Sequence, residues 1–323
     1  MNSDGEGLRA IQIGMNSNDI VGSARLFAEL GFHNAGGHMI WGGPMAIQGL
    51  ASSARALMWW LVGRQTFVQL ELFQHTEPMQ RPLPADWRCS DLGWSRFGIA
   101  ISRLDAAKTT LVKWGIPLTG ECVDPDGTKR IAFREPFVGC FVELFEDGDG
   151  IPGGRRAHHH DLDPAIVYAT SSVSDLAATR EFYENVLNLK IVSDVVIHRP
   201  EHEALWELSG ARSESFVVDG GGFLLEIVQY LDPVGRPKPD DYRTADQGLV
   251  NIALGTRLRA VAEEAVERVK QTGCHMAPLS IFGDACGTYV LEPEREFEIG
   301  AIPASLDAAF GFEPAAPFFG QQF

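Results

Sequence analysis

The hydrophobic and polar positions of the chain repeat one order of elements. In residues 11–32 an apolar, strand-like run precedes Asp19, and a helical pattern then continues to about Gly31. Residues 167–189 follow the same order, with Asp175 at an offset of 156 residues from Asp19. An aspartate before an amphipathic run favours a helix start, because its side chain accepts hydrogen bonds from free helix amides. The pattern therefore predicts two equivalent strand–helix units.

Each unit continues into alternating strand-like runs that end in an acidic strand, TFVQLELFQ in the first and GGFLLEIVQ in the second. Two further strand–helix units, residues 96–115 and 251–273, lead to the acidic strands GCFVELFE and EREFEIGAI. Repeats of this length are read before single motifs, since each repeat is one structural unit. The sequence predicts an α+β fold of four strand–helix–strands modules, paired in succession into two domains.

We expect the first domain to span residues 1–150 and the second to span residues 164–305. A linker at 151–163, rich in glycine, charge and histidine, would join them. A polar connection at residues 75–88 would join the two modules of the first domain. The tail, residues 306–323, is apolar and aromatic without a clear period. It either covers a groove or contacts a second subunit in a homodimer.

Composition and charge narrow the class of protein. The 323 residues are 45% hydrophobic and 22% charged, which is typical of a globular chain. The formal net charge of −16 repels phosphate backbones and anionic membranes, so we expect no nucleic acid or membrane partner. No apolar stretch has the length of a membrane helix, and no secretory signal is predicted. Five cysteines without a CxxC spacing favour a reducing cytoplasm.

The repeated module resembles the vicinal oxygen chelate superfamily, which includes glyoxalase I, extradiol dioxygenases and the fosfomycin- and bleomycin-resistance proteins. The stretches FYENVLNL (residues 182–189) and SARLFAELGF (residues 23–32) are the most similar to that family. The resemblance implies that each module is a βαβββ unit and that two modules form one cupped sheet around a cavity. It also implies that metal ligands come from the first and last strands, commonly a His or Gln first and a Glu last.

The resemblance assigns one site position to the first strand and one to the last strand of every module. The first-strand positions are Gln12, Arg96, Tyr168 and Asn251. The last-strand positions are Glu71, Glu143, Glu226 and Glu298. Equivalent positions recur between the two halves at offsets of 155 or 156 residues, which supports the assignment. None of the first-strand positions is His, which disfavours extradiol iron chemistry, because that chemistry needs two imidazoles and a carboxylate.

In the first predicted domain, Gln12, Glu71 and Glu143 match a Gln/Glu/Glu subset of glyoxalase I ligands, and Arg96 stands where the remaining His would be. A guanidinium stays protonated and cannot ligate a metal. We therefore expect no metal or other cofactor there, and we expect Arg96→His to create metal affinity. If a divalent metal does bind, the resemblance implies as ligands Gln12, Glu71 and Glu143, or Glu226 and Glu298.

In the second predicted domain, Glu298 is the candidate proton-transfer residue, beside Glu226 as a second acid. Tyr168 and Asn251 would hold the substrate oxygen, and His198 is a further candidate from a neighbouring strand. An alternative is that the two glutamates are strand carboxylates hydrogen-bonded to their neighbours. The two quartets, one in each domain, are expected to be close in space.

The resemblance implies an enzyme, a lyase or isomerase that moves a proton on a small, largely apolar or aromatic oxygenated molecule. A different class stays open, a metal-free protein that binds or sequesters a small molecule, as resistance proteins do. A third reading is a divalent-metal enzyme of glyoxalase or dioxygenase type with atypical ligands. The feature that separates the first two is whether Glu298 lies in the cavity without a cationic partner.

Overall fold

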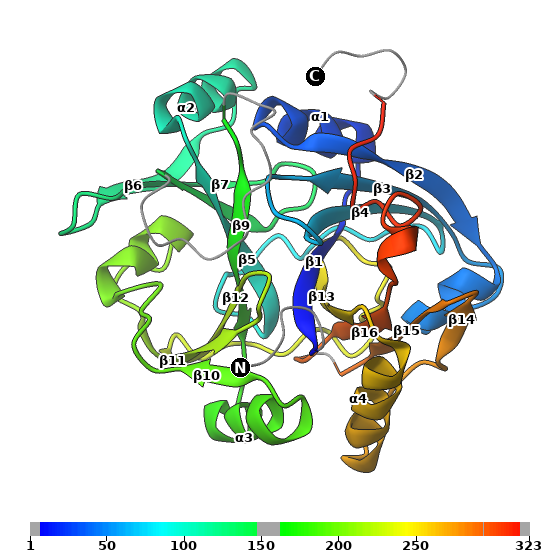
Figure 1. Ribbon diagram of the computed structural model, residues 1–323. Helices are drawn as coiled ribbons and strands as arrows, with labels where there is room; N and C mark the ends of the chain where they lie inside the picture. Colours follow the sequence, from blue (N-terminus) through cyan, green and yellow to red (C-terminus); the bar gives the residue numbers. More distant parts are fainter. Residues whose placement is uncertain (1–6, 147–161, 293, 317–323) are drawn as a thin grey trace.

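The structure is a computed structural model that describes residues 7–146, 162–292 and 294–316. Figure 1 shows the four modules and their helices. Module one contains β1 (Arg9–Asn16), α1 (Ile20–Glu29), β2 (His33–Trp41), the short helix η1 (Gly43–Gln48), β3 (Arg55–Val62) and β4 (Gln69–Glu77). Module two contains β5 (Gly93–Ile101), α2 (Leu104–Lys113), β6 (Leu118–Val123), β7 (Lys129–Arg134) and β8 (Phe141–Glu146).

Module three contains β9 (Ala165–Ser172), α3 (Leu176–Glu181), η2 (Phe182–Val186), β10 (Lys190–Val192), η3 (Pro200–Trp206), β11 (Arg212–Asp219) and β12 (Leu224–Asp232). Module four contains β13 (Gly248–Thr256), α4 (Arg259–Gln271), β14 (Ser280–Phe282), β15 (Ala285–Val290), β16 (Phe297–Ala301) and η4 (Ala304–Leu306). Both predicted caps form: Asp19 accepts a hydrogen bond from the Gly22 amide at 3.0 Å, and Asp175 accepts one from the Ala178 amide at 2.9 Å.

The strands form two eight-stranded sheets, and each sheet combines strands from both halves of the chain. One has the order β14-β15-β16-β13-β1-β4-β3-β2, the other β10-β11-β12-β9-β5-β8-β7-β6. The antiparallel pairs β1–β13 and β5–β9 join the modules within each sheet. The α+β fold class with paired cupped sheets is confirmed, but module one pairs with module four and module two with module three.

The predicted succession, one with two and three with four, is therefore wrong. The physical reason is that β1, β5, β9 and β13 are buried central strands with equivalent edges, so the repeat alone is compatible with either pairing. The connection at residues 78–92 runs from β4 in one sheet to β5 in the other. The boundaries 1–150 and 164–305, as limits of separately folding units, stay a prediction.

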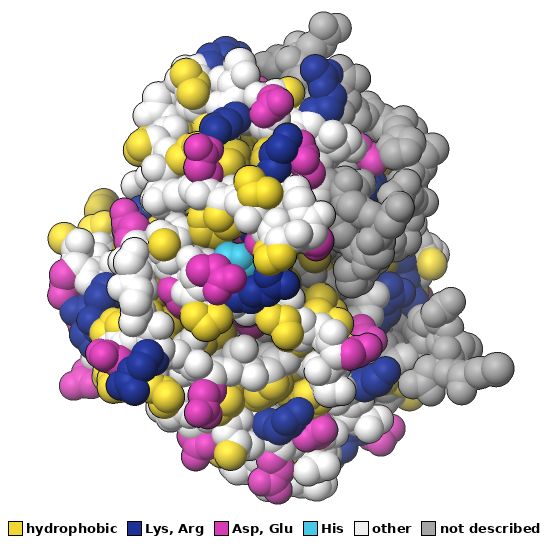
Figure 2. Space-filling view, turned by 90° about the vertical axis from the view of Figure 1, so that its left-hand side faces the viewer, with side chains coloured by type: hydrophobic (Ala, Val, Ile, Leu, Met, Phe, Trp, Pro, Cys, Tyr) yellow, Lys and Arg dark blue, Asp and Glu magenta, His cyan; other side chains and the backbone are white. Residues whose placement is uncertain are grey.

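The described residues leave out 147–161, which include most of the linker predicted at 151–163. They also leave out residues 317–323 of the tail. The helices pack their apolar faces against the sheets in a core that joins the modules. Phe27 of α1, for example, contacts Phe97 of β5 with ring centroids 6.1 Å apart. On the face shown in Figure 2, acidic and basic side chains alternate without a continuous patch of one sign. In the described part of the chain, no helix has the length and apolarity to cross a membrane.

Candidate functional site

The eight predicted site residues fall into two groups, one on each sheet. We call the concave side of the sheet of modules one and four cup A, and that of modules two and three cup B. Cup A contains Gln12, Glu71, Asn251 and Glu298. Cup B contains Arg96, Glu143, Tyr168 and Glu226. The two groups differ in chemistry, because cup A holds a cavity whereas the centre of cup B is filled by paired charges.

Cup A encloses a cavity of about 270 Å³, with largely apolar walls from β3, β4, β15, η1 and the segment after η4. On one side, Glu71 accepts hydrogen bonds from Trp60 Nε1 at 2.9 Å and from Gln12 Nε2 at 2.5 Å. Gln69 Nε2 donates in turn to Gln12 Oε1 at 2.7 Å. This network fixes Gln12 and Glu71 in place. Burial, together with the nearby charge of Glu298, raises the pKa of Glu71 well above its usual value.

Glu298 lies on the other side of the cavity, and part of its side chain is accessible from it. Burial raises the pKa of this carboxyl to about 7, and no described cation or hydrogen-bond donor offsets the shift. No Lys or Arg is among the described residues that line the cavity. The carboxylate therefore lies in the cavity with no described Lys or Arg beside it, the arrangement that the sequence analysis associated with an enzyme.

Two neutral polar side chains lie near the two carboxylates. Asn251 is fully buried; its amide forms no hydrogen bond of good geometry with described residues, but it lies within reach of the Tyr289 hydroxyl. A buried amide without a well-formed hydrogen bond costs about 1–3 kcal/mol, so this position calls for a structural or functional explanation. Tyr289 is also buried, and burial with the charges of Glu298 and Glu71 raises the pKa of its phenol, which stays a hydrogen-bond donor.

The donor set of cup A fits a hard divalent cation. Two carboxylates and two amides supply the oxygen ligands that such ions take, from Glu71, Glu298, Gln12 and Asn251. The expectation of a metal-free protein stays a prediction.

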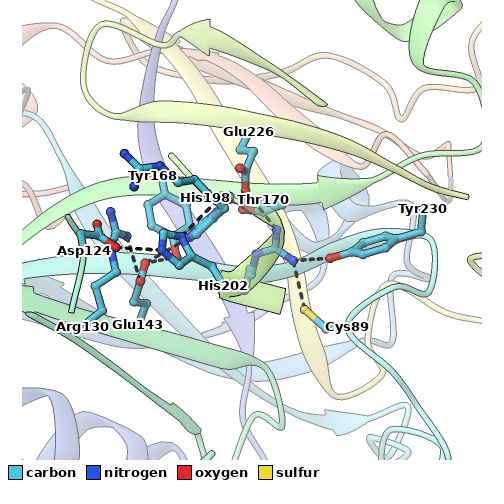
Figure 3. Close-up of polar contacts among 12 residues, drawn as sticks. Cys89, Asp124, Arg130, Glu143, Tyr168, Thr170, His198, His202, Glu226 and Tyr230 are labelled. Atoms are coloured by element: carbon cyan, nitrogen blue, oxygen red, sulfur yellow. Dashed lines mark hydrogen bonds and ion pairs between the residues drawn. The ribbon is translucent and has the colours of Figure 1, made fainter. Parts of the chain in front are cut away.

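Cup B is a network of buried charges (Figure 3). Arg96 donates to Glu226 at 3.1 Å, and the Tyr168 hydroxyl donates to Glu143 at 2.5 Å. His198 lies between the two carboxylates: its Nδ1 is 2.8 Å from Glu226 and its Nε2 is 3.3 Å from Glu143. All five side chains are at most 5% exposed. His198 therefore contacts both last-strand glutamates, the pair that would ligate a metal in the family pattern.

The electrostatics of cup B agree with this arrangement. Burial alone would raise the pKa of Glu143 and of Glu226. The hydrogen bonds and charge of His198 lower both pKa values by more than this, and Arg130 adds to the effect on Glu143 and Arg96 to that on Glu226. Both pKa values fall to about 2. Burial likewise opposes the charged form of His198, yet the two glutamates raise its pKa.

Aromatic and polar side chains close cup B. The Trp206 ring of η3 lies 4.9 Å from the Arg96 guanidinium and 5.3 Å from the His198 ring. Arg96 also donates to the Tyr230 hydroxyl at 2.8 Å. A fixed guanidinium and a bridging imidazole leave these carboxylates no room for a cation, so cup B does not fit a metal. Arg96 thus pairs with Glu226 and not with Glu71 or Glu143, the carboxylates beside which the sequence pattern placed it.

Beside cup B, Cys122, Asp124 and His202 place potential ligand atoms within 4.8 Å of one another. Asp124 already accepts a hydrogen bond from Arg130 Nε at 2.7 Å and lies 2.8 Å from His202 Nε2. The carboxylate is thus committed to protein partners, and the group is an extension of the cup B network.

The predicted quartets are wrong in their membership, because each mixed residues of both cups. Gln12 and Glu71 do not meet Arg96 and Glu143, so Arg96→His cannot complete a ligand set with Gln12. Tyr168, Glu226 and His198 contact one another in cup B and cannot assist Glu298. The cause is the pairing of modules, which the repeat offset does not encode. Asn251 is the one proposed partner that shares a cup with Glu298.

Sequence reasoning also missed the side chains that complete each site. Trp60, Gln69 and Tyr289 in cup A, and Arg130 and Tyr230 in cup B, come from middle or neighbouring strand positions. The available signal was the alternation of side chains along a strand, which places Gln69 and Glu71 on the same face. Without the pairing of modules, however, that signal does not indicate which cup each residue enters.

Residues 165–280 match the model of the Glyoxalase/Bleomycin resistance protein/Dioxygenase superfamily. The resemblance to the vicinal oxygen chelate superfamily is confirmed. A crystal structure of a putative dioxygenase from Bacillus subtilis subsp. subtilis str. 168 is 13% identical, with a TM-score of 0.63 over 96% of this chain and 91% of that one. Glyoxalase I from Zea mays is also 13% identical, with a TM-score of 0.59 over 94% of this chain and 96% of that one. At this identity the likeness shows the fold. No curated protein matches the chain.

Proposed function

We propose that the protein is a lyase or isomerase that transfers a proton through Glu298 on a small molecule bound in cup A. The observation that carries the proposal is the position of Glu298, in a cavity with apolar walls and with no Lys or Arg among its described lining residues. An acid–base group near neutrality takes and returns a proton without a large barrier, and a pKa of about 7 is of that kind.

The neighbouring side chains support the same chemistry. When Glu298 removes a proton beside a carbonyl, negative charge develops on the carbonyl oxygen. The Tyr289 phenol, which lines the cavity, and the Asn251 amide beside it are neutral donors, and they would stabilise such an oxygen by hydrogen bonding. Gln12 and Trp60 hold Glu71 at the side of the cavity, so Glu71 keeps its position while Glu298 exchanges the proton.

A divalent cation held by Gln12, Glu71, Asn251 and Glu298 would polarise the same carbonyl oxygen as a Lewis acid. The chain's own contribution is the same with or without it: an apolar chamber, a carboxylate that carries the proton, and neutral hydrogen-bond donors.

The cavity also indicates the class of substrate. A volume of about 270 Å³ suits a small molecule, and walls that include Met58, Trp60 and Phe310 favour apolar or aromatic groups. The lining holds no Lys or Arg that could pair with an anion. We therefore propose a neutral, largely apolar carbonyl or hydroxycarbonyl compound. A cytoplasmic location and a homodimer are proposed with it; the five cysteines are free, as expected in a reducing compartment.

Glu298→Gln tests the proposal, because it keeps the shape of the side chain and removes the base. A panel of small apolar ketones and α-hydroxyketones is incubated in deuterated water, and exchange of the carbon-bound proton is followed by NMR. We expect the native protein to exchange at least one member, and the variant to lose about 100–1,000-fold in rate while ligand binding persists. Glu263→Gln, at an exposed position on α4, is the matched control and should leave the rate unchanged.

Two results would contradict the proposal. Exchange that continues in Glu298→Gln at near the native rate would remove Glu298 from the reaction. Tight binding of a panel member without any exchange in the native protein would favour the binding or sequestration function.

A further inference from the structure

A second, larger cavity lies between the two connections that cross from one sheet to the other. It has a volume of about 670 Å³ and is lined by residues 81–87, 91–94 and 236–250 in part, together with Cys140. It shares no lining residue with the cavity of cup A. Volumes of about 300–1,000 Å³ are typical of small-molecule sites, so the size alone calls for an explanation.

The two connections are copies of one motif at an offset of 155 residues. PMQRPLPADWRCSDLG (residues 78–93) aligns with PVGRPKPDDYRTADQG (residues 233–248). Identical residues stand at the first proline, at RP, at the following proline, and at the later Asp, Arg, Asp and Gly. Both copies begin with a cis X-Pro bond, Glu77–Pro78 and Asp232–Pro233. The motif therefore belongs to the repeated unit of the sequence.

The arginine of each connection forms hydrogen bonds and ion pairs with two aspartates of the other connection. Arg81 donates to Asp246 through Nε at 3.0 Å and to Asp241 through Nη1 at 2.5 Å. Arg236 makes the equivalent contacts to Asp91, through Nε at 3.0 Å, and to Asp86. Asp91 and Asp246 are nearly buried, so these bidentate contacts hold the cavity walls in a fixed geometry. The cavity is therefore formed before any ligand binds.

The two halves of the cavity differ where the copies of the motif differ. Leu83 and Trp87 in the first copy correspond to Lys238 and Tyr242 in the second. Trp87 stacks on Phe141, so the first half is an apolar, aromatic wall. In the second half, Lys238 is paired with Glu296, and the Tyr242 hydroxyl donates to the same carboxylate at 3.0 Å. The cavity therefore has one apolar end and one polar end.

The charges on the lining are already neutralised. Arg81, Arg236 and Lys238 each contact a carboxylate of the protein. A charged ligand would have to displace one of these partners, whereas a neutral ligand would not. Aromatic and proline surfaces favour a flat aromatic body, because ring faces stack on them at little entropic cost. The Lys238–Tyr242 end can meet one hydroxyl or carbonyl group.

We propose that this cavity is a second ligand site, and that it binds a neutral, planar aromatic molecule whose single polar group faces Lys238 and Tyr242. The site is independent of the reaction proposed for cup A. Its ligand lies between the Trp87 and Tyr242 sides of the two connections.

The test uses 2-naphthol, a neutral bicyclic aromatic with one hydroxyl, and measures its affinity for the full-length protein by calorimetry and tryptophan fluorescence. Two matched variants separate the sites. Ala85→Trp fills the mouth of the cavity between the connections, and Ala309→Trp fills the mouth of cup A; both alanines are exposed. We expect Ala85→Trp to weaken binding by at least about tenfold and Ala309→Trp to leave it unchanged.

A second comparison tests the polar end. Lys238→Leu places there the residue that the first copy of the motif carries at Leu83. The native protein should prefer 2-naphthol to naphthalene, and this variant should lose most of that preference, by about tenfold. A cooperative thermal transition shows that each variant is folded; Lys238→Leu should melt at a lower temperature, because it leaves the buried Glu296 carboxylate without its cation.

Three results would overturn the proposal: no binding of 2-naphthol up to about 1 mM, binding lost in Ala309→Trp but kept in Ala85→Trp, or equal affinity for both aromatics in the native protein. The second result would place the probe in cup A.

Discussion

Glu226→Gln tests whether the buried charge network of cup B stabilises the folded protein. The substitution keeps the size of the side chain and removes the negative charge that Arg96 and His198 share. Arg96 and Glu226 are only 1% and 2% exposed, so water cannot replace the lost partner. The variant therefore leaves the buried Arg96 guanidinium without its carboxylate and takes one of the two carboxylates from His198, so we expect a large loss of stability.

The magnitude follows from the pKa of Glu226. Its folded-state value of about 2 lies well below the ordinary 4.5. A difference of this size corresponds to about 3 kcal/mol of folding free energy, at 1.36 kcal/mol for each pKa unit. Removing one partner from a buried ion pair costs about 3–5 kcal/mol in other proteins, so the two arguments agree. Glu143 shares His198, so the effects of substituting both glutamates will not add.

The pH dependence has a definite sign. Because the folded-state pKa is depressed, the stabilisation is fully present above the ordinary pKa of about 4.5 and is lost as the pH falls through the folded value near 2. The difference between the native protein and Glu226→Gln should be largest at neutral pH. At about pH 3 it should have fallen to about half.

Urea denaturation, followed by tryptophan fluorescence at a series of pH values, measures the difference. Glu263→Gln is the control, since its ion pair with Arg259 is exposed to solvent and should contribute little to stability. The double variant Arg96→Met/Glu226→Met removes both charges and should recover part of the loss. A cost below about 1 kcal/mol for Glu226→Gln, or a difference that grows as the pH falls, would refute the reasoning.

Other variants test neighbouring parts of the structure by the same denaturation assay. Because the pKa of His198 is raised in the folded state, its protonation stabilises the fold below the ordinary pKa of 6.5, and this contribution is lost as the pH rises through the folded-state pKa. His198→Gln should not show this decrease in the free energy of unfolding at higher pH. Gly98→Ala places a methyl group 2.0 Å from the Tyr168 ring and should cost about 1–3 kcal/mol, whereas Gly43→Ala, in open space, should cost much less. Asn251→Leu removes a buried amide that has no hydrogen bond of good geometry and should cost little stability, yet proton exchange in cup A should fall; a stability loss above about 2 kcal/mol would contradict this.

The sequence was sufficient for the fold of each module and for the positions of the site residues within it. Asp19 and Asp175 cap their helices because capping depends on a few neighbouring residues. The four glutamates of the last strands point into the cups because side chains alternate along a strand and the apolar residues fix which face is buried. Arg96 could be recognised from the sequence as a permanent charge at a ligand position, but the carboxylate that it pairs with, Glu226, could not.

Which residues meet across the sheets was decided by the tertiary structure alone. The edges of β1, β5, β9 and β13 are interchangeable in sequence, and the long connections permit either pairing of modules. Pairing module one with module four gives Glu298 neutral neighbours and an open cavity. Pairing module two with module three brings Arg96 and His198 to Glu226 instead. A carboxylate is fixed on its strand by local pattern, but its pKa and its chemistry depend on long-range neighbours, and these exist only in the folded chain.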